Sequence, residues 1–207
     1  MKTGTSIILL LYLSIGILHG QQTDADKGLP GKLMQDYFSA AQEYALIYNG
    51  KEYSRYEKQT TNHPYLVNAE FEEGTISSGK TLYPRLLMKL DLFRDELVLQ
   101  SPKKLYPVVA EKDRIDYILL NGYHIINPSV RGWQDLIGDE YVVLLSDSIY
   151  PVIKKYIVTY EEKVNGLSIE ASFRIKERFY VVKENRCHPV KNKRALLNLF
   201  PDKKKEL

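Results

Sequence analysis

The sequence is poor in the residues that staple small proteins together or build the commonest active sites. Cys187 is the only cysteine among 207 residues, so an internal disulfide is excluded and the fold has to be held by packing. The chain contains no G-x-S-x-G, H-E-x-x-H, Walker or C-x-x-C sequence. These absences argue against the familiar serine hydrolases, zinc proteases, nucleotide hydrolases and thiol oxidoreductases.

Histidine is also scarce. Beyond residue 20 the chain has only His63, His124 and His188, and none has a partner at metal-ligand spacing. Cys187 precedes His188 in a strand-like stretch, where successive side chains point to opposite faces, so the two do not form a Cys/His dyad. The sequence therefore predicts no catalytic residue, no metal site and no cofactor.

The sequence also lacks a large excess of charge of either sign. The 29 lysines and arginines nearly balance the 26 aspartates and glutamates, which gives a net charge of +3. Such a chain has no strong field for nucleic acid, so we expect no nucleic-acid partner. Glu70, Glu72 and Glu73 cluster beside a strand and are either a solvated face or part of a carboxylate pair.

The first 20 residues have the pattern of a secretory signal. Lys2 precedes an apolar run over residues 7–18, and Gly20 precedes a polar stretch. That run is shorter than the roughly 20 residues of a spanning helix, so a cleaved signal peptide at 1–20 is favoured over a membrane anchor. We expect no transmembrane segment after its removal, a flexible entry at 21–32 and one β-rich domain at 33–207.

Alternation of apolar and polar residues is the clearest structural signal. The 16 tyrosines sit among valine, isoleucine and leucine, which suit a pleated surface. Residues 85–93, RLLMKLDLF, alternate with period two, and a turn near residues 94–95 leads into ELVLQ at 96–100. This pattern predicts a hairpin whose inward side chains are Leu86, Met88, Leu90 and Leu92, with Arg85, Lys89 and Asp91 on the other face.

Turn signals predict further hairpins. Asn-Gly occurs at 49–50, 121–122 and 165–166, other turns are expected at 146–148 and between residues 172–176 and 178–184, and no long helical pattern intervenes. We therefore predict a mainly β fold: an antiparallel meander, curved or half-barrel-like, in which 127–140 connects two halves of the sheet. Short helices are predicted at 32–46 and 192–200.

Aromatic residues supply the candidate ligand or partner surface. Tyr48, Tyr53, Tyr56 and Trp133 have flat apolar rings with polar tips, which suits stacking on a sugar or packing on a partner. The alternative is structural, because strands need such residues to cover the sheet, and Trp133 would then plug one end of it.

Three stretches carry a family resemblance. YNGKEY at 48–53, LLMKLDLFRDELVL at 86–99 and ALLNLFPDKKKEL at 195–207 resemble a group of uncharacterised exported proteins of Bacteroidota-type bacteria. The resemblance implies a periplasmic, outer-membrane-associated or secreted location, and it implies no activity and no catalytic residues.

Two functional classes remain open. The first is a non-enzymatic envelope protein that binds a protein, a lipid-like molecule or a glycan, and the second is a small exported hydrolase with carboxylate acid/base catalysis. An apolar cavity in the structure would favour a carrier, and two converging carboxylates in a polar cleft would favour a hydrolase. An exposed strand edge would favour pairing with another protein.

Overall fold

The computed structural model describes residues 46–79, 81–103, 105–166 and 168–201, all within one compact unit, Phe38–Leu207. The expected signal peptide, entry segment and all but the last residue of the first helix lie outside these residues, as does the 202–207 tail. Leu46 instead begins a short 3-10 turn, η4 (Leu46–Tyr48). In the described part of the chain, no helix is both long enough and apolar enough to cross a membrane.

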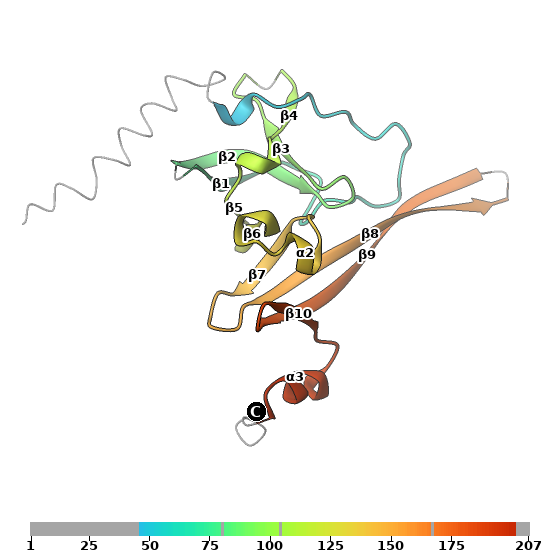
Figure 1. The fold of residues 1–207 in the computed structure, drawn as a ribbon. Coiled ribbons are helices and arrows are strands. Elements are labelled where there is room, and N and C mark those ends of the chain that lie inside the picture. Colours follow the sequence, from blue (N-terminus) through green and yellow to red (C-terminus); the bar gives the residue numbers. More distant parts are fainter. Residues whose placement is uncertain (1–45, 80, 104, 167, 202–207) are drawn as a thin grey trace, which may run out of the picture. The chain divides into compact units, whose positions relative to one another are not determined.

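Within the described residues, the fold is one open antiparallel sheet of ten strands, which confirms the mainly β prediction (Figure 1). Its order across the sheet is β10-β9-β8-β7-β6-β5-β1-β2-β3-β4. The strands are β1 (Glu72–Ser78), β2 (Thr81–Asp91), β3 (Glu96–Gln100), β4 (Pro107–Val109), β5 (Tyr117–Leu120), β6 (Tyr123–Ile126), β7 (Val142–Ser146), β8 (Val152–Asn165), β9 (Ser168–Lys183) and β10 (Arg186–Pro189).

This order consists of two meanders rather than one. Strands β1 to β4 form the first and β5 to β10 the second, and they join because β5 pairs with β1. The chain passes between them at 110–116, through the turn η5 (Lys112–Arg114). Segment 127–140, with η6 (Pro128–Arg131) and the single helical turn α2 (Gln134–Ile137), instead connects β6 to its direct neighbour β7.

Most of the expected hairpins are confirmed. Strands β2 and β3 pair as predicted, Asn121-Gly122 joins β5 to β6 with both residues at positive φ, and the turn after Ser146 joins β7 to β8. Asn165-Gly166 lies at the β8–β9 turn. The C-terminal helix is α3 (Lys193–Leu199), whose first turn is capped by the Asn192 side chain.

Two expected hairpins are wrong. Asn49-Gly50 forms none, because Gly50 lies against β4: a β-carbon there would be 1.6 Å from the carbonyl oxygen of Val109. No turn separates 172–176 from 178–184, because β9 runs unbroken and pairs with β8 from Ser168 to Val181. The turn after β9 is at Glu184-Asn185, where both residues have positive φ.

The main core lies on the face of the sheet that the alternation predicted. Leu86, Met88 and Leu90 of β2 are buried there with Leu97 and Leu99, while Leu92 is partly buried against them. A second cluster includes Trp133, Ile153 and Val182. The opposite face of β2 and β3 is covered by the segment 51–71, whose Tyr53 packs with Val98 and Val109.

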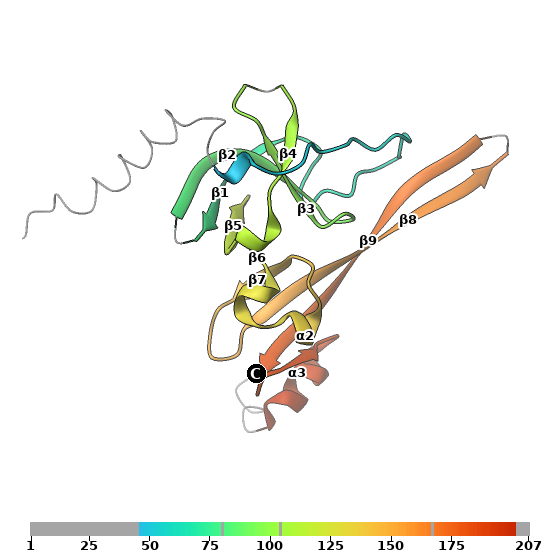
Figure 2. The same cartoon turned by 45° about the horizontal axis from the view of Figure 1, so that its top comes forward.

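Strands β8 and β9 form a ribbon that extends past the strands beside them, as Figures 1 and 2 both show. Strand β7 pairs with β8 only over residues 152–154, and β10 pairs with β9 only over residues 180–183. Farther out, the 51–71 segment holds the β9 edge: Thr61 N–H donates to Ala171 O, and the Asn62 amide bonds both backbone groups of Phe173.

Candidate binding groove

A buried carboxylate organises the 51–71 segment. Asp91, the last residue of β2, has no exposed surface. Its Oδ2 accepts hydrogen bonds from the hydroxyls of Tyr53 at 2.8 Å and Tyr56 at 2.7 Å, and its Oδ1 accepts from the backbone N–H groups of Phe93 and Arg94, both at 3.0 Å. Four donors satisfy both oxygens, which is the condition for burying this group.

Asp91 lies on the face of β2 that the alternation predicted, and it is nevertheless fully buried. Period-two alternation does place it opposite Leu90, but the 51–71 segment covers that second face. Alternation along β2 shows which residues share a face, and it cannot show that both faces are covered.

The tyrosine hydroxyls form a chain of donors. The Tyr53 proton is committed to Asp91, so in the 3.1 Å contact between the Tyr53 and Tyr65 hydroxyls the donor is Tyr65. Burial raises the pKa of Tyr53, Tyr56 and Tyr65, and the bonds to Asp91 raise the first two further. These phenols therefore stay protonated at physiological pH and serve as donors rather than bases.

Cations occupy the aromatic faces beside this network. The Arg94 guanidinium lies 4.2 Å from the centroid of the Tyr56 ring and 5.2 Å from that of Tyr53. The Lys89 amine lies 4.1 Å from the Tyr65 centroid and 4.7 Å from that of Phe71, and it donates to Ala69 O. Burial lowers the pKa of Lys89. Such contacts hold the aromatic rings of the 51–71 segment in place, and they leave little of the Tyr56 or Tyr65 ring face free for a ligand.

A groove of about 650 Å³ opens between the 51–71 segment, β2, β3 and the start of β4. Its rim includes Tyr106, which is 48% exposed, and Leu105 beside it. Many of its other side chains are polar or charged: Arg55, Glu57, Lys58, Gln59, Thr60, Glu70 and Gln100.

The four predicted site residues do not form one surface. Tyr53 and Tyr56 meet at Asp91 and line the groove, whereas Tyr48 packs half-buried against the main core. Trp133 is 9% exposed and lies in the second core cluster, consistent with a structural role. Sequence reasoning missed Leu105 and Tyr106, although an apolar pair before Pro107 in an otherwise polar turn is a signal for them.

Among the described residues that line the groove there is no Ser/His/Asp or Cys/His arrangement. His63 Nδ1 accepts a hydrogen bond from the N–H of Tyr65 at 3.3 Å, and its ring stacks on Tyr65. Outside the groove, Cys187 is half-buried against the second cluster, and burial raises the pKa of its thiol, which opposes a nucleophilic role. No group of three or more metal-ligating side chains occurs in the described residues.

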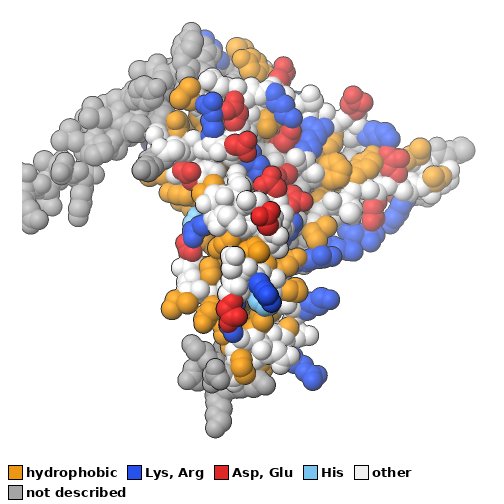
Figure 3. All heavy atoms as spheres, viewed as in Figure 1, with side chains coloured by type: hydrophobic (Ala, Val, Ile, Leu, Met, Phe, Trp, Pro, Cys, Tyr) orange, Lys and Arg blue, Asp and Glu red, His pale blue; other side chains and the backbone are white. Residues whose placement is uncertain are grey.

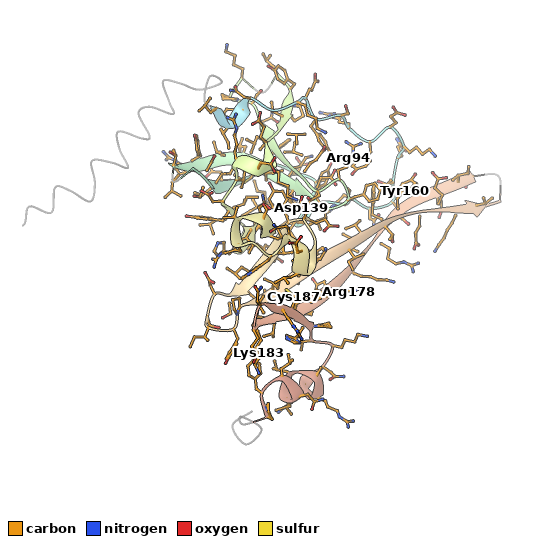
Figure 4. All side chains as sticks on the ribbon, in the orientation of Figure 1. Arg94, Asp139, Tyr160, Arg178, Lys183 and Cys187 are labelled. Carbon is orange, nitrogen blue, oxygen red and sulfur yellow. The ribbon has the colours of Figure 1, made fainter. Side chains whose placement is uncertain are left out.

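The turn after β2 also meets the ribbon. Phe173 of β9 is the centre of an aromatic cluster, with ring centroids 5.2 Å from Tyr56, 5.3 Å from Phe93 and 5.5 Å from Tyr160. Figure 4 labels Arg94 on this turn and Tyr160 on β8. The wall of the groove is therefore fixed from two sides, by Asp91 and by the ribbon.

Comparison of the chain with protein families, curated proteins and solved structures finds no match.

Proposed function

We propose that this protein is an exported, non-enzymatic binding module that holds a glycan in the groove beside Tyr106. The observation that carries the proposal is the groove itself: about 650 Å³, within the range of roughly 300–1,000 Å³ typical of small-molecule sites. Its inner wall is held by the Asp91 network before any ligand arrives, so binding costs little ordering.

The side chains on the rim favour a glycan over a lipid-like ligand. Amide, hydroxyl and charged groups of both signs, such as Gln59, Thr60 and Glu57, match the hydroxyls of a sugar as donors and acceptors. Tyr106 contributes an exposed aromatic ring on which a pyranose can pack. A lipid-like chain would need a wall without these polar groups.

The proposal that the protein is exported is based on the signal-like pattern of residues 1–20. To test it, the protein should be purified from the envelope fraction or the medium of the producing cell. Its intact mass should correspond to a chain that starts at Gln21. This mature protein is then screened against an array of oligosaccharides, and the best ligand is measured by calorimetry.

The Tyr106→Ala variant should bind this glycan about tenfold more weakly, equivalent to about 1.4 kcal/mol. Tyr150→Ala is the matched control, because Tyr150 is also exposed but lies outside the groove. Equal affinities for Tyr106→Ala and the parent, or no glycan bound at all, would refute the proposal.

One observation keeps the hydrolase as the alternative. Glu57 and Glu70 both line the groove, and a glycosidase needs two carboxylates. Mass spectrometry of the glycan after prolonged incubation decides between the two. Cleavage that is lost in both Glu57→Gln and Glu70→Gln would establish the hydrolase, while an intact glycan supports the binding module.

A further inference from the structure

The outer edge of β8 is a long strand edge that this fold leaves unpaired within its described residues. The sheet's terminal strands are protected in the ways usual for edges. Strand β4 has only three residues, begins with Pro107 and is bridged by Glu52, while β10 has four residues and ends at Pro189. Beyond Lys154, no described strand or loop pairs with the outer edge of β8.

The direction of the backbone groups on this edge follows from the contacts of β9. Ala171, Phe173 and Phe179 turn their backbone groups away from β8, because they bond Thr61, Asn62 and Val190. Their partners on β8 are Glu162, Tyr160 and Lys154, so the even-numbered residues of β8 also point their N–H and C=O groups outward. Tyr156, Val158 and Tyr160 thus present a row of donors and acceptors.

The sequence of this edge is complementary to itself when reversed. Residues 155–161, which lie beyond the contact of Lys154 with β7, read KYIVTYE, with a lysine at one end, a glutamate at the other and a tyrosine two residues from Val158 on each side. From this symmetry we infer that the edge pairs antiparallel with the same edge of a second copy of the chain, centred on Val158. Such a two-fold contact is isologous, because one patch serves both partners.

Charge selects this register over its neighbours. With Val158 opposite its counterpart, Lys155 faces the partner's Glu161, and Tyr156 faces the partner's Tyr160. A pairing centred on Thr159 would set Lys155 against the partner's Lys163, and a parallel in-register pairing would set every charge against its like. In the pairing centred on Val158, residues whose backbone N–H and C=O groups point outward also lie opposite one another in the two copies, as an antiparallel hydrogen-bond ladder requires.

The existing contacts of these charges are compatible with the pairing. Lys155 already bonds Glu140 and the carbonyl of Ile137, and Glu161 bonds Arg174. An ammonium has three donors and a carboxylate about four acceptor positions, so the intermolecular pair adds to these bonds. Ile175, which is 39% exposed, pairs with Val158 and therefore lies beside the two-fold axis on the same face. Figure 3 shows apolar side chains on the visible surface of the ribbon.

Sedimentation velocity over a concentration series of the mature protein tests the pairing. The parent chain should show a monomer–dimer equilibrium. Val158→Pro should raise the dissociation constant of the dimer at least about tenfold, because proline removes an outward N–H that no described residue of the same chain accepts. Ile175→Pro is the matched control, since Ile175 faces outward on the opposite edge, between the residues bonded by Asn62 and Val190. Its dimer should persist.

Crosslinking tests the register. In a Cys187→Ala background, Val158→Cys should give a disulfide-linked dimer on mild oxidation, because directly opposed strand residues lie within disulfide reach. Thr159→Cys should not, since the two cysteines would be offset by two residues along the strands. A parent chain that stays monomeric, a dimer untouched by Val158→Pro, or equal crosslinking through residue 159 would each overturn the inference.

Discussion

Two hairpins of this fold, β2–β3 and β8–β9, have similar local sequences and very different surroundings. Each contains one strand in which apolar and charged residues alternate, over residues 88–91 (MKLD) of β2 and residues 173–176 (FRIK) of β9. In β2–β3, Met88, Val98 and Leu99 have no exposed surface, because neighbouring strands flank the hairpin and side chains cover both faces. In the outer ribbon, Val164 is 79% exposed and Ile169 is 65% exposed.

The difference shows that neighbours, rather than strand propensity, decide what a hairpin contributes. A two-stranded ribbon is at best marginally stable in water without a third element against it. The outer ribbon obtains that support from the 51–71 segment, through Thr61, Asn62 and the rings around Phe173. The same segment builds the groove, so the groove wall and the ribbon share one structural support.

The largest expected effect distinguishes the two hairpins directly. Leu90, 2% exposed in β2, should not tolerate Leu90→Asp, which buries an unpaired charge and should cost about 4 kcal/mol or more. Thr159→Asp, at an exposed position in β8, should change the free energy of unfolding by no more than about 0.5 kcal/mol. Urea denaturation of both variants provides the measurement. Equal decreases in the free energy of unfolding for the two variants would show that position 159 of the ribbon matters as much for stability as position 90 of β2.

A smaller effect is expected where the 51–71 segment meets the first hairpin. Asp91→Ala leaves two tyrosine hydroxyls and two backbone N–H groups without their acceptor, and it should cost about 2–4 kcal/mol. The control is Asp147→Ala, which removes only an exposed ion pair with Arg131 and should leave the urea midpoint unchanged. A silent Asp91→Ala would mean that the segment is held by apolar packing alone.

The fold was predictable from the sequence where the pattern was local. Alternation in 85–93 and the Asn121-Gly122 turn indicated β2, β3, β5 and β6, because each signal lies within a few residues. Strand β1, EEGTISS, was not predicted, although it joins the two meanders. Its Gly74 packs so closely that a β-carbon would lie 2.7 Å from the carbonyl oxygen of Leu119, and such a requirement is invisible without the partner strand.

The groove was predictable only in part. Tyr53 and Tyr56 stood out as aromatics, but their hydroxyls are engaged by Asp91, which is distant in sequence. The long uninterrupted β9 was also missed, since nothing in 172–184 shows that β8 supplies a partner for each residue up to Val181. Contacts between distant segments decide both cases, and a single sequence does not display them.

The smallest expected effect isolates the contact between the 51–71 segment and the ribbon. Asn62 uses its side-chain amide as a strand would use its backbone: it donates to Phe173 O and accepts from Phe173 N–H, both at 2.7 Å. Asn62→Ala should lower the free energy of unfolding by only about 1 kcal/mol. The amide hydrogen of Phe173 should nevertheless exchange with solvent much faster, while that of Leu97 in β3 should keep its protection, because local opening needs less energy than global unfolding. Asn198→Ala, on the exposed side of α3, should alter neither rate. Unchanged exchange at Phe173 would mean that the surrounding rings, rather than Asn62, hold the ribbon against the segment.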